Sequence, residues 1–174
     1  MVAAVCAAWL LGCVSTPDTA ELQLKPIVYA GRFTMSYQKL GTLAREQGRF
    51  EWKIQDTARD DKAMQLSLLS PLGTTLALIA YNPSADAAKR ASFTSPINIE
   101  FAPDLDTLMH GLLGWQLPLA ALTPWLSRTP PAQTLEDWKV SVLSRHDNGL
   151  PKIMTADNAV LQLSTRLVFE EPAP

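Results

Sequence analysis

The chain has 174 residues, of which 47% are hydrophobic and 18% charged, and its formal net charge is −2. This length predicts one domain with a proper hydrophobic core, and the apolar composition excludes a disordered chain. Lys and Arg are scattered among acidic residues, which argues against a surface that binds nucleic acid. The two cysteines, Cys6 and Cys13, both lie near the N-terminus. The rest of the chain therefore offers neither a disulfide framework nor a zinc site.

The N-terminal segment predicts a targeting signal. Residues 2–12 form an uncharged apolar run that is too short to span a bilayer but suits a signal peptide. The run ends in Leu10-Leu11-Gly12-Cys13, which has the form of a lipobox: an apolar residue, a small residue before the cysteine, and a thiol to carry diacylglycerol. We predict that residues 1–12 are a lipoprotein signal peptide and that Cys13 is the lipidated residue.

The consequence of this lipidation is a permanent membrane anchor. Each buried CH₂ contributes about 0.8 kcal/mol, so two or three acyl chains hold a protein on a membrane. Val14 after the cysteine, in place of Asp, favours the outer membrane. Residues 13–27 would be a tether, and we expect no cofactor or metal besides the covalent lipid. The alternative interpretation is a buried N-terminal helix with two incidental cysteines.

From Val28 onward the hydrophobic pattern has a period of two, which predicts strands with one buried face. Clear alternation is found in Phe50, Trp52 and Ile54, which stand between charged and polar neighbours. Proline-containing breaks mark turns between the runs. The predicted strands are residues 28–37, 49–55, 64–68 and 74–81, followed by weaker ones near 91–94 and 97–101.

The period then changes to that of a helix. Apolar residues recur at helical spacing from Leu105 to Leu113, after Asp104 as the predicted N-cap and before Gly114 as the stop. A second short helix is predicted to start at Pro118, and Pro124 should kink or shorten it.

Strand pattern returns at residues 138–142, and a last hairpin is predicted with strands Lys152–Ala156 and Val160–Phe169 around a turn at Asp157-Asn158. Strands, then helices, then strands indicate a curved antiparallel sheet with helices packed on one face. Such a sheet leaves room for a ligand beneath the helices. The fold class is therefore mainly β with short helices, and the domain should span residues 28–170, with 171–174 as a tail.

Four motifs follow one another along the chain. They are Gly31-Arg32-Phe33, the run from Gly48 to Trp52, the run from Leu69 to Thr74, and the run from Leu112 to Leu119, with Trp125-Leu126 after it. They resemble those of the LolB family, the outer-membrane receptors that take lipoproteins from the periplasmic carrier LolA. The resemblance covers roughly residues 28–170. It implies an incomplete, half-open β-barrel whose helices cover an apolar cavity that receives acyl chains.

Two sets of candidate site residues follow. Leu72 stands between Pro71 and Gly73, in a turn that should protrude, and the resemblance implies that it meets the outer membrane. A leucine folded back against the domain is the alternative. The second set shares apolar strand or helix faces and would line the acyl-chain cavity, unless these side chains pack solidly. Its members are Phe33, Phe50, Trp52, Leu66, Leu76, Leu78, Leu108, Leu112 and Trp125.

The sequence contains no motif of a catalytic or metal centre, so we expect a protein that is not an enzyme. By the resemblance, the expected partners are a LolA-type carrier, triacylated lipoproteins as cargo and outer-membrane lipid, with no nucleic acid, and the chain is expected to act as a monomer. Two other functions stay open: a lipocalin-like carrier of a small apolar ligand, and an outer-membrane assembly lipoprotein that works through protein contacts.

Overall fold

The protein is described by a computed structural model that covers residues 26–171, except 40, 57–61, 114–118, 130, 132–134 and 136. The predicted signal peptide, Cys13 and nearly all of the predicted tether lie outside these residues. Gly114 and Pro118, at the predicted helix boundaries, lie outside them as well.

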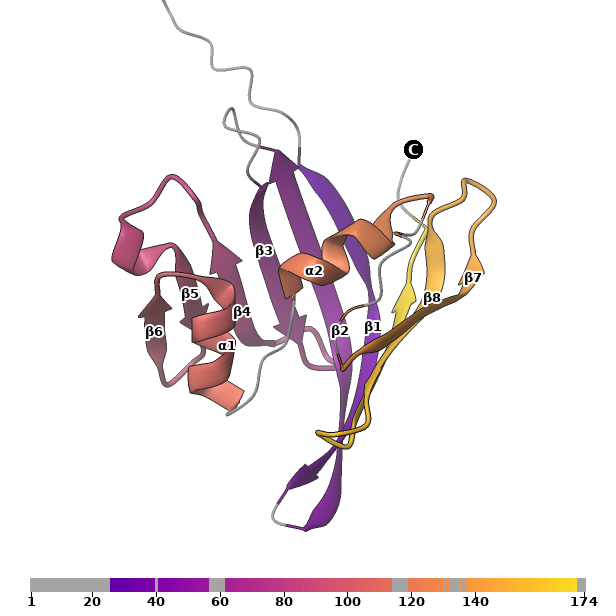
Figure 1. Ribbon diagram of the computed structural model, residues 1–174, viewed down its shortest axis with the longest axis horizontal. Helices are drawn as coiled ribbons and strands as arrows, with labels where there is room; N and C mark the ends of the chain where they lie inside the picture. The colour runs from indigo at the N-terminus through magenta and orange to yellow at the C-terminus, as the bar shows by residue number, and fades with distance from the viewer. Residues whose placement is uncertain are drawn as a thin grey trace, which may run out of the picture.

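Within these described residues, nine antiparallel strands form one curved sheet, in the order β6-β5-β4-β3-β2-β1-β9-β8-β7 (Figure 1). This confirms a mainly β fold built on an antiparallel sheet that is not closed into a barrel. The strands are β1 Ile27–Lys39, β2 Thr42–Asp56, β3 Lys62–Leu69, β4 Thr75–Tyr81, β5 Ala91–Thr94, β6 Ile99–Ala102, β7 Lys139–Arg145, β8 Pro151–Asn158 and β9 Leu163–Phe169.

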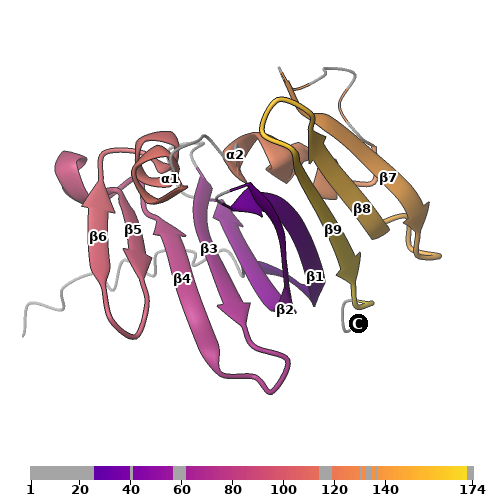
Figure 2. The same cartoon turned by 90° about the horizontal axis from the view of Figure 1, so that it is seen from below.

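The chain order explains why helices cover one face of this sheet. Strands β1 to β6 follow one another to one edge, whereas β7 forms the opposite edge and β9 pairs with β1. The link from β6 to β7 must therefore cross the sheet. It contains α1 Leu105–Leu113, α2 Leu119–Leu122 and the 3₁₀ helix η2 Thr123–Leu126. Both α1 and α2 lie on the same side of the curved sheet (Figure 2).

Alternation along the strands produces the buried inner face. In β2 the side chains of Phe50, Trp52 and Ile54 are buried, whereas Arg49 points outward on the opposite face. The period-two prediction is confirmed for this strand, because each inner residue faces the core that the helices cover.

Two glycines permit close approach at positions where the sequence repeats Gly-Arg-Phe. A Cβ added at Gly48 would lie 2.2 Å from the Leu69 carbonyl oxygen and 2.9 Å from Cε1 of Phe33, its partner on β1. A Cβ at Gly31 would lie 2.1 Å from the Val168 carbonyl oxygen. Glycine is needed at both positions because any side chain would push neighbouring strands apart.

The predicted start of the first helix is confirmed. Oδ1 of Asp104 accepts a 2.7 Å hydrogen bond from the Thr107 backbone N–H, which is otherwise without a partner in the first turn. This bond lowers the pKa of the Asp104 carboxyl below its ordinary value of 3.8. The prediction for Pro124 is also confirmed, because α2 ends after one turn and the chain continues as η2.

Two predictions about strands were wrong. Leu76 and Leu78 lie on the outer face of β4, because Leu66 on the inner face of β3 pairs with Ile79. β4 is apolar on both faces, so its composition did not reveal which face is buried. The predicted turn at Asp157-Asn158 belongs to β8, and the turn lies at residues 159–162, where Gln162 has a φ of 51°.

We expect Asp104→Ala to lower the free energy of unfolding by about 1 kcal/mol, because the first turn of α1 loses its cap. Since the folded-state pKa is lowered, the contribution of Asp104 is complete above the ordinary value of 3.8 and is lost as pH falls through the lowered pKa. Urea unfolding across pH measures both effects. Asp104→Asn is the matched control, because its amide oxygen keeps the cap without titrating. Equal stability of Asp104→Ala and the wild type would contradict this account.

Candidate functional site

An apolar cavity of about 260 Å³ lies between the inner face of the sheet and the two helices. It draws on strands from both halves of the chain as well as on α1 and α2. Its lining is almost entirely aliphatic and aromatic, so it suits a nonpolar occupant. The lining residues are Phe33, Met35, Phe50, Trp52, Leu66, Leu68, Ile79, Phe93, Met109, Leu112, Leu119, Leu122, Met154, Ala156, Thr165 and Leu167.

One wall of the cavity is a row of side chains across four adjacent strands. Trp52 on β2 pairs with Leu66 on β3, Leu66 pairs with Ile79 on β4, and Ile79 pairs with Phe93 on β5. Residues that are paired in this way share a face of the sheet. The row is therefore continuous and places two aromatic rings at its ends.

The opposite wall comes from the C-terminal hairpin. Met154 on β8 pairs with Leu167 on β9, and Leu167 pairs with Phe33 on β1. Met154 is fully buried, while Phe33 and Leu167 are partly exposed. Because the sheet is curved, this row and the first wall line the same cavity from its two sides.

The helices form the cover. Met109 and Leu112 line the cavity from α1, and Leu119 and Leu122 line it from α2. Their side chains are aliphatic, as the amphipathic pattern of the linker requires. The helical link therefore completes the cavity as well as joining the two edges of the sheet.

Polar groups in the cavity are few. Among the described lining residues, Thr165 alone bears a hydroxyl, and Trp52 brings a buried indole N–H. Among the described residues, Nε1 of Trp52 and Nε1 of Trp125 have no hydrogen-bond acceptor. Near the cavity, Tyr29 packs edge-on against Phe169, and burial raises the pKa of its hydroxyl.

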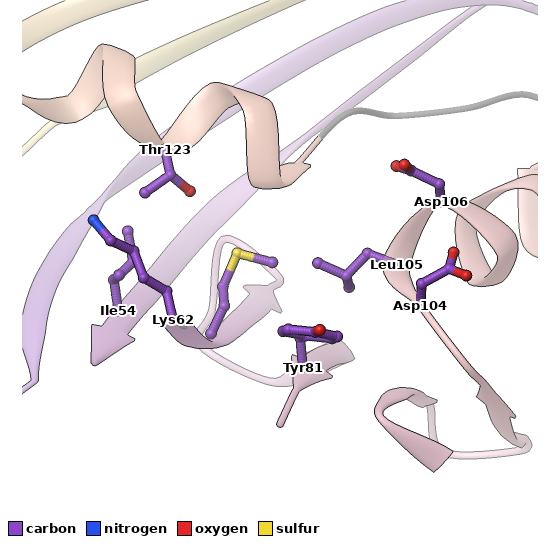
Figure 3. Close-up of a pocket in the computed structure, with 8 residues that line it drawn as sticks. Ile54, Lys62, Tyr81, Asp104, Leu105, Asp106 and Thr123 are labelled. Carbon is purple, nitrogen blue, oxygen red and sulfur yellow. The ribbon is translucent and has the colours of Figure 1, made fainter. Parts of the chain in front are cut away.

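A second hollow of about 310 Å³ continues the same inner face (Figure 3). Ile54 and Met64 line it from the sheet, and Leu105 lines it from α1. Ile54 and Met64 are the next inner positions after Trp52 and Leu66 along β2 and β3. Polar and charged side chains surround this hollow, namely Lys62, Tyr81, Asp104, Asp106 and Thr123.

Five of the nine predicted cavity residues line the cavity: Phe33, Phe50, Trp52, Leu66 and Leu112. The other four do not. Leu108 is 2% exposed and packs in the solid core, and Trp125 is partly buried against that core. Leu76 and Leu78 were placed on the wrong face of β4, where Leu76 is 45% exposed.

Leu72 lies at the tip of the β3–β4 turn and is 96% exposed. The Gly73 N–H donates to the Ser70 carbonyl over 2.9 Å, and Gly73 has a φ of 89°, which favours glycine. The alternative of a leucine folded back against the domain is therefore wrong.

Sequence reasoning missed lining residues of two kinds. Ile79 and Phe93 follow from strand register, which periodicity alone does not give. Met154, Ala156 and Leu167 belong to the C-terminal hairpin, whose alternation was visible but whose position opposite β2 and β3 was not. Alternation within these strands was visible in the sequence, but which strands face one another across the cavity was not.

Comparison with known proteins identifies the family. Residues 27–165 match the family described as outer membrane lipoprotein LolB. The chain belongs to the LolB family. Two curated outer-membrane lipoproteins LolB are each 35% identical to this chain. The one from Cupriavidus metallidurans matches 82% of the chain, and the one from Cupriavidus necator matches 70%. A third, from Ralstonia nicotianae, is 28% identical over 98% of this chain and 95% of its own length.

The two Cupriavidus relatives are longer, and the matched part of this LolB-family chain covers 65% and 59% of their lengths. Family membership places the chain at the outer membrane of a Gram-negative bacterium as a lipoprotein. Within the described residues, no helix combines the length and apolar character that crossing a bilayer requires. The same residues contain no cluster of potential metal ligands.

We expect Ala156→Phe to fill much of the cavity, because the added ring enters a space lined by Met154 and Leu167. Binding of an apolar fluorescent probe such as phenylnaphthylamine should fall at least severalfold. Ala80→Phe is the matched control, since Ala80 lies on the outer face of β4. Equal probe binding by Ala156→Phe and Ala80→Phe would show that the probe does not use this cavity.

Proposed function

We propose that this LolB-family chain is a lipid-anchored receptor that accepts lipoproteins from a LolA-type periplasmic carrier and inserts them into the inner leaflet of the outer membrane. The acyl chains of the cargo would occupy the cavity between the sheet and the helices. The observation that carries this proposal is the lining of the cavity, in which aliphatic and aromatic side chains come from both the sheet and its cover.

The physical need for such a cavity is strong. Exposing apolar surface to water costs about 25 cal/mol per Å². Lipidated cargo therefore needs a sheltered path across the aqueous periplasm. A wall such as Trp52, Leu66 and Ile79 offers acyl chains contacts like those of a bilayer interior, while the cargo polypeptide stays outside.

The buried N–H of Trp52 fits one detail of the cargo. Among the described residues, this N–H has no hydrogen-bond acceptor. An ester or amide carbonyl at the head of an acyl chain would supply one. Pairing with the carbonyl would remove the penalty of a buried polar group without a partner. Such a contact would fix the depth to which the chain enters.

Transfer along this route requires only that the free energy of the cargo falls at each step, from carrier to receptor to bilayer. A cargo that binds the carrier weakly, this receptor more tightly and the bilayer most tightly moves forward without a chemical step. The sequence contains no phosphate-binding glycine loop, in keeping with transfer that is not driven by nucleotide hydrolysis. In this proposal the chain has no catalytic group, and it acts as a monomer.

Two residues would connect the receptor to the membrane in different ways. Acyl chains on Cys13 would supply the attachment. Leu72, exposed at the tip of its turn, would insert into the interface and contribute about 1.5–3 kcal/mol if fully buried in lipid. Because this is small beside the anchor, the role of Leu72 would be to orient the cavity toward the bilayer.

A carrier of a small apolar ligand is the second candidate. The volume of about 260 Å³ lies just below the range of about 300–1,000 Å³ that ligand pockets usually have. It therefore fits one small ligand without any movement of α1 or α2. Mass spectrometry of the purified protein separates the two functions, because a carrier would retain a free small ligand.

We expect Leu72→Glu to accept a triacylated lipoprotein from LolA but to deliver it poorly to membranes. The exposed position means that the change leaves the fold intact, whereas a carboxylate resists entry into lipid. Transfer from LolA and delivery to phospholipid vesicles are measured separately with the lipid-anchored protein.

Val160→Glu provides the control, because Val160 is another exposed aliphatic residue, 78% exposed in the β8–β9 turn. It should both accept and deliver cargo. Normal delivery by Leu72→Glu would contradict the orienting role, and failure of the wild-type protein to accept cargo from LolA would contradict the receptor function itself.

A further inference from the structure

Two turns of the sheet share one sequence pattern. The β3–β4 turn reads Ser70-Pro71-Leu72-Gly73, and the β5–β6 turn reads Ser95-Pro96-Ile97-Asn98. Leu72 and Ile97 are each 96% exposed. Strands β3 to β6 are paired in sequence and antiparallel, so these two alternate turns lie at the same end of the sheet (Figure 2).

Hydrogen bonds hold both turns in similar ways. The Ser70 N–H donates to the Thr74 carbonyl, and the Ser95 N–H donates to the Asn98 carbonyl, each over 2.8 Å. Each serine Oγ also accepts a backbone N–H over 3.1 Å, from Thr74 or from Asn98.

The proline in each turn fixes one further backbone angle. Each aliphatic side chain is therefore held outward at the tip of a constrained turn. Such a fixed, exposed position suits a side chain that contacts a partner.

The surface between the two tips is also free of charge. Residues 63–85 and 91–99 include no Asp, Glu, Lys or Arg. On the outer face, Leu76 is 45% exposed and Ile99 is 60% exposed. By contrast, β2 carries the ion pair of Lys53 and Glu51, whose nitrogen and oxygen lie 2.7 Å apart. Burying these residues in lipid would thus desolvate no charged side chain among them, which removes the main obstacle to such contact. The charge nearest to the β5–β6 turn is Glu100, whose Oε1 accepts a 2.5 Å hydrogen bond from Nδ2 of Asn98.

We propose that Ile97 is a second membrane-contacting side chain, and that the corner formed by the β3–β4 and β5–β6 turns rests on the phospholipid bilayer. The inference rests on the proposed delivery function, in which the bilayer is the destination of the cargo. A lipid surface is the partner that fits, because the chain belongs to an outer-membrane lipoprotein family and the two turns present aliphatic side chains and contain no charged residue.

A second contact would define how the sheet meets the membrane. Leu78 pairs with Thr94, so the Leu72 tip extends about three residues, or roughly 10 Å, farther along the strands than the Ile97 tip. The two turns are two strands apart, which is again roughly 10 Å across the sheet. With both tips in the interface, the strands would meet the bilayer obliquely, whereas one tip alone would leave the domain free to swing about it.

The test uses the full lipid-anchored protein with one new cysteine, Leu72→Cys, Ile97→Cys or Leu143→Cys, labelled with an environment-sensitive fluorophore. Leu143 is the control, because it is 58% exposed on β7 at the opposite edge of the sheet. The wild-type chain measures any labelling of Cys6 or Cys13. Proteins are placed in phosphatidylethanolamine and phosphatidylglycerol vesicles with or without nitroxide-labelled lipid.

We expect emission from position 97 to shift to shorter wavelength and to be lost to nitroxide quenching, as at position 72, while position 143 shows neither change. Quenching at 72 but not at 97 would overturn the inference and leave the proposed function standing. Quenching at neither position would show that neither Leu72 nor Ile97 contacts the membrane. A change at 97 that requires added LolA in place of lipid would also overturn it, because the partner would then be a protein.

Discussion

Burial of the inner face of the β-sheet is the interaction on which the other features depend. In the described part of the chain, nine strands present aromatic and aliphatic side chains on this face, and the sheet does not close upon itself. The chain covers the face with the helical link that joins edge strands β6 and β7. Sheet residues such as Leu163 and Phe169 are fully buried, at 3% and 4% exposed, whereas coverage is incomplete over the cavity.

The incomplete coverage explains how stability and binding coexist. Solid packing of Leu108, Leu126 and Phe169 against neighbouring elements stabilises the domain. Outward movement of the helices would break no strand pair, and it would let the cavity of about 260 Å³ admit a longer occupant. The same apolar face would thus hold the fold together when empty and shelter acyl chains when filled. The exposed corner with Leu72 and Ile97 lies outside this core, so changes there need not affect folding.

Local features and the overall architecture were predictable from the sequence, whereas the strand register that assigns each residue to a face was not. Alternation predicted the inner face of β2, Asp104 predicted the start of α1, and Pro124 predicted the early end of α2. Because β4 is apolar on both faces, Leu76 and Leu78 were assigned to the wrong face, and only the pairing of Leu66 with Ile79 resolves this. The contribution of Met154 likewise depends on which strands face one another across the cavity, and alternation within β8 does not give this.

In the proposed function, the acyl chains of cargo occupy the inner face of the sheet. Photocrosslinking can locate them, with a lipoprotein whose acyl chain carries a diazirine bound to the intact receptor and the attached residues identified by mass spectrometry. We expect crosslinks on Leu66, Leu112 and Met154, which line the cavity. Crosslinks confined to outer-face residues such as Leu78, with none inside the cavity, would contradict it.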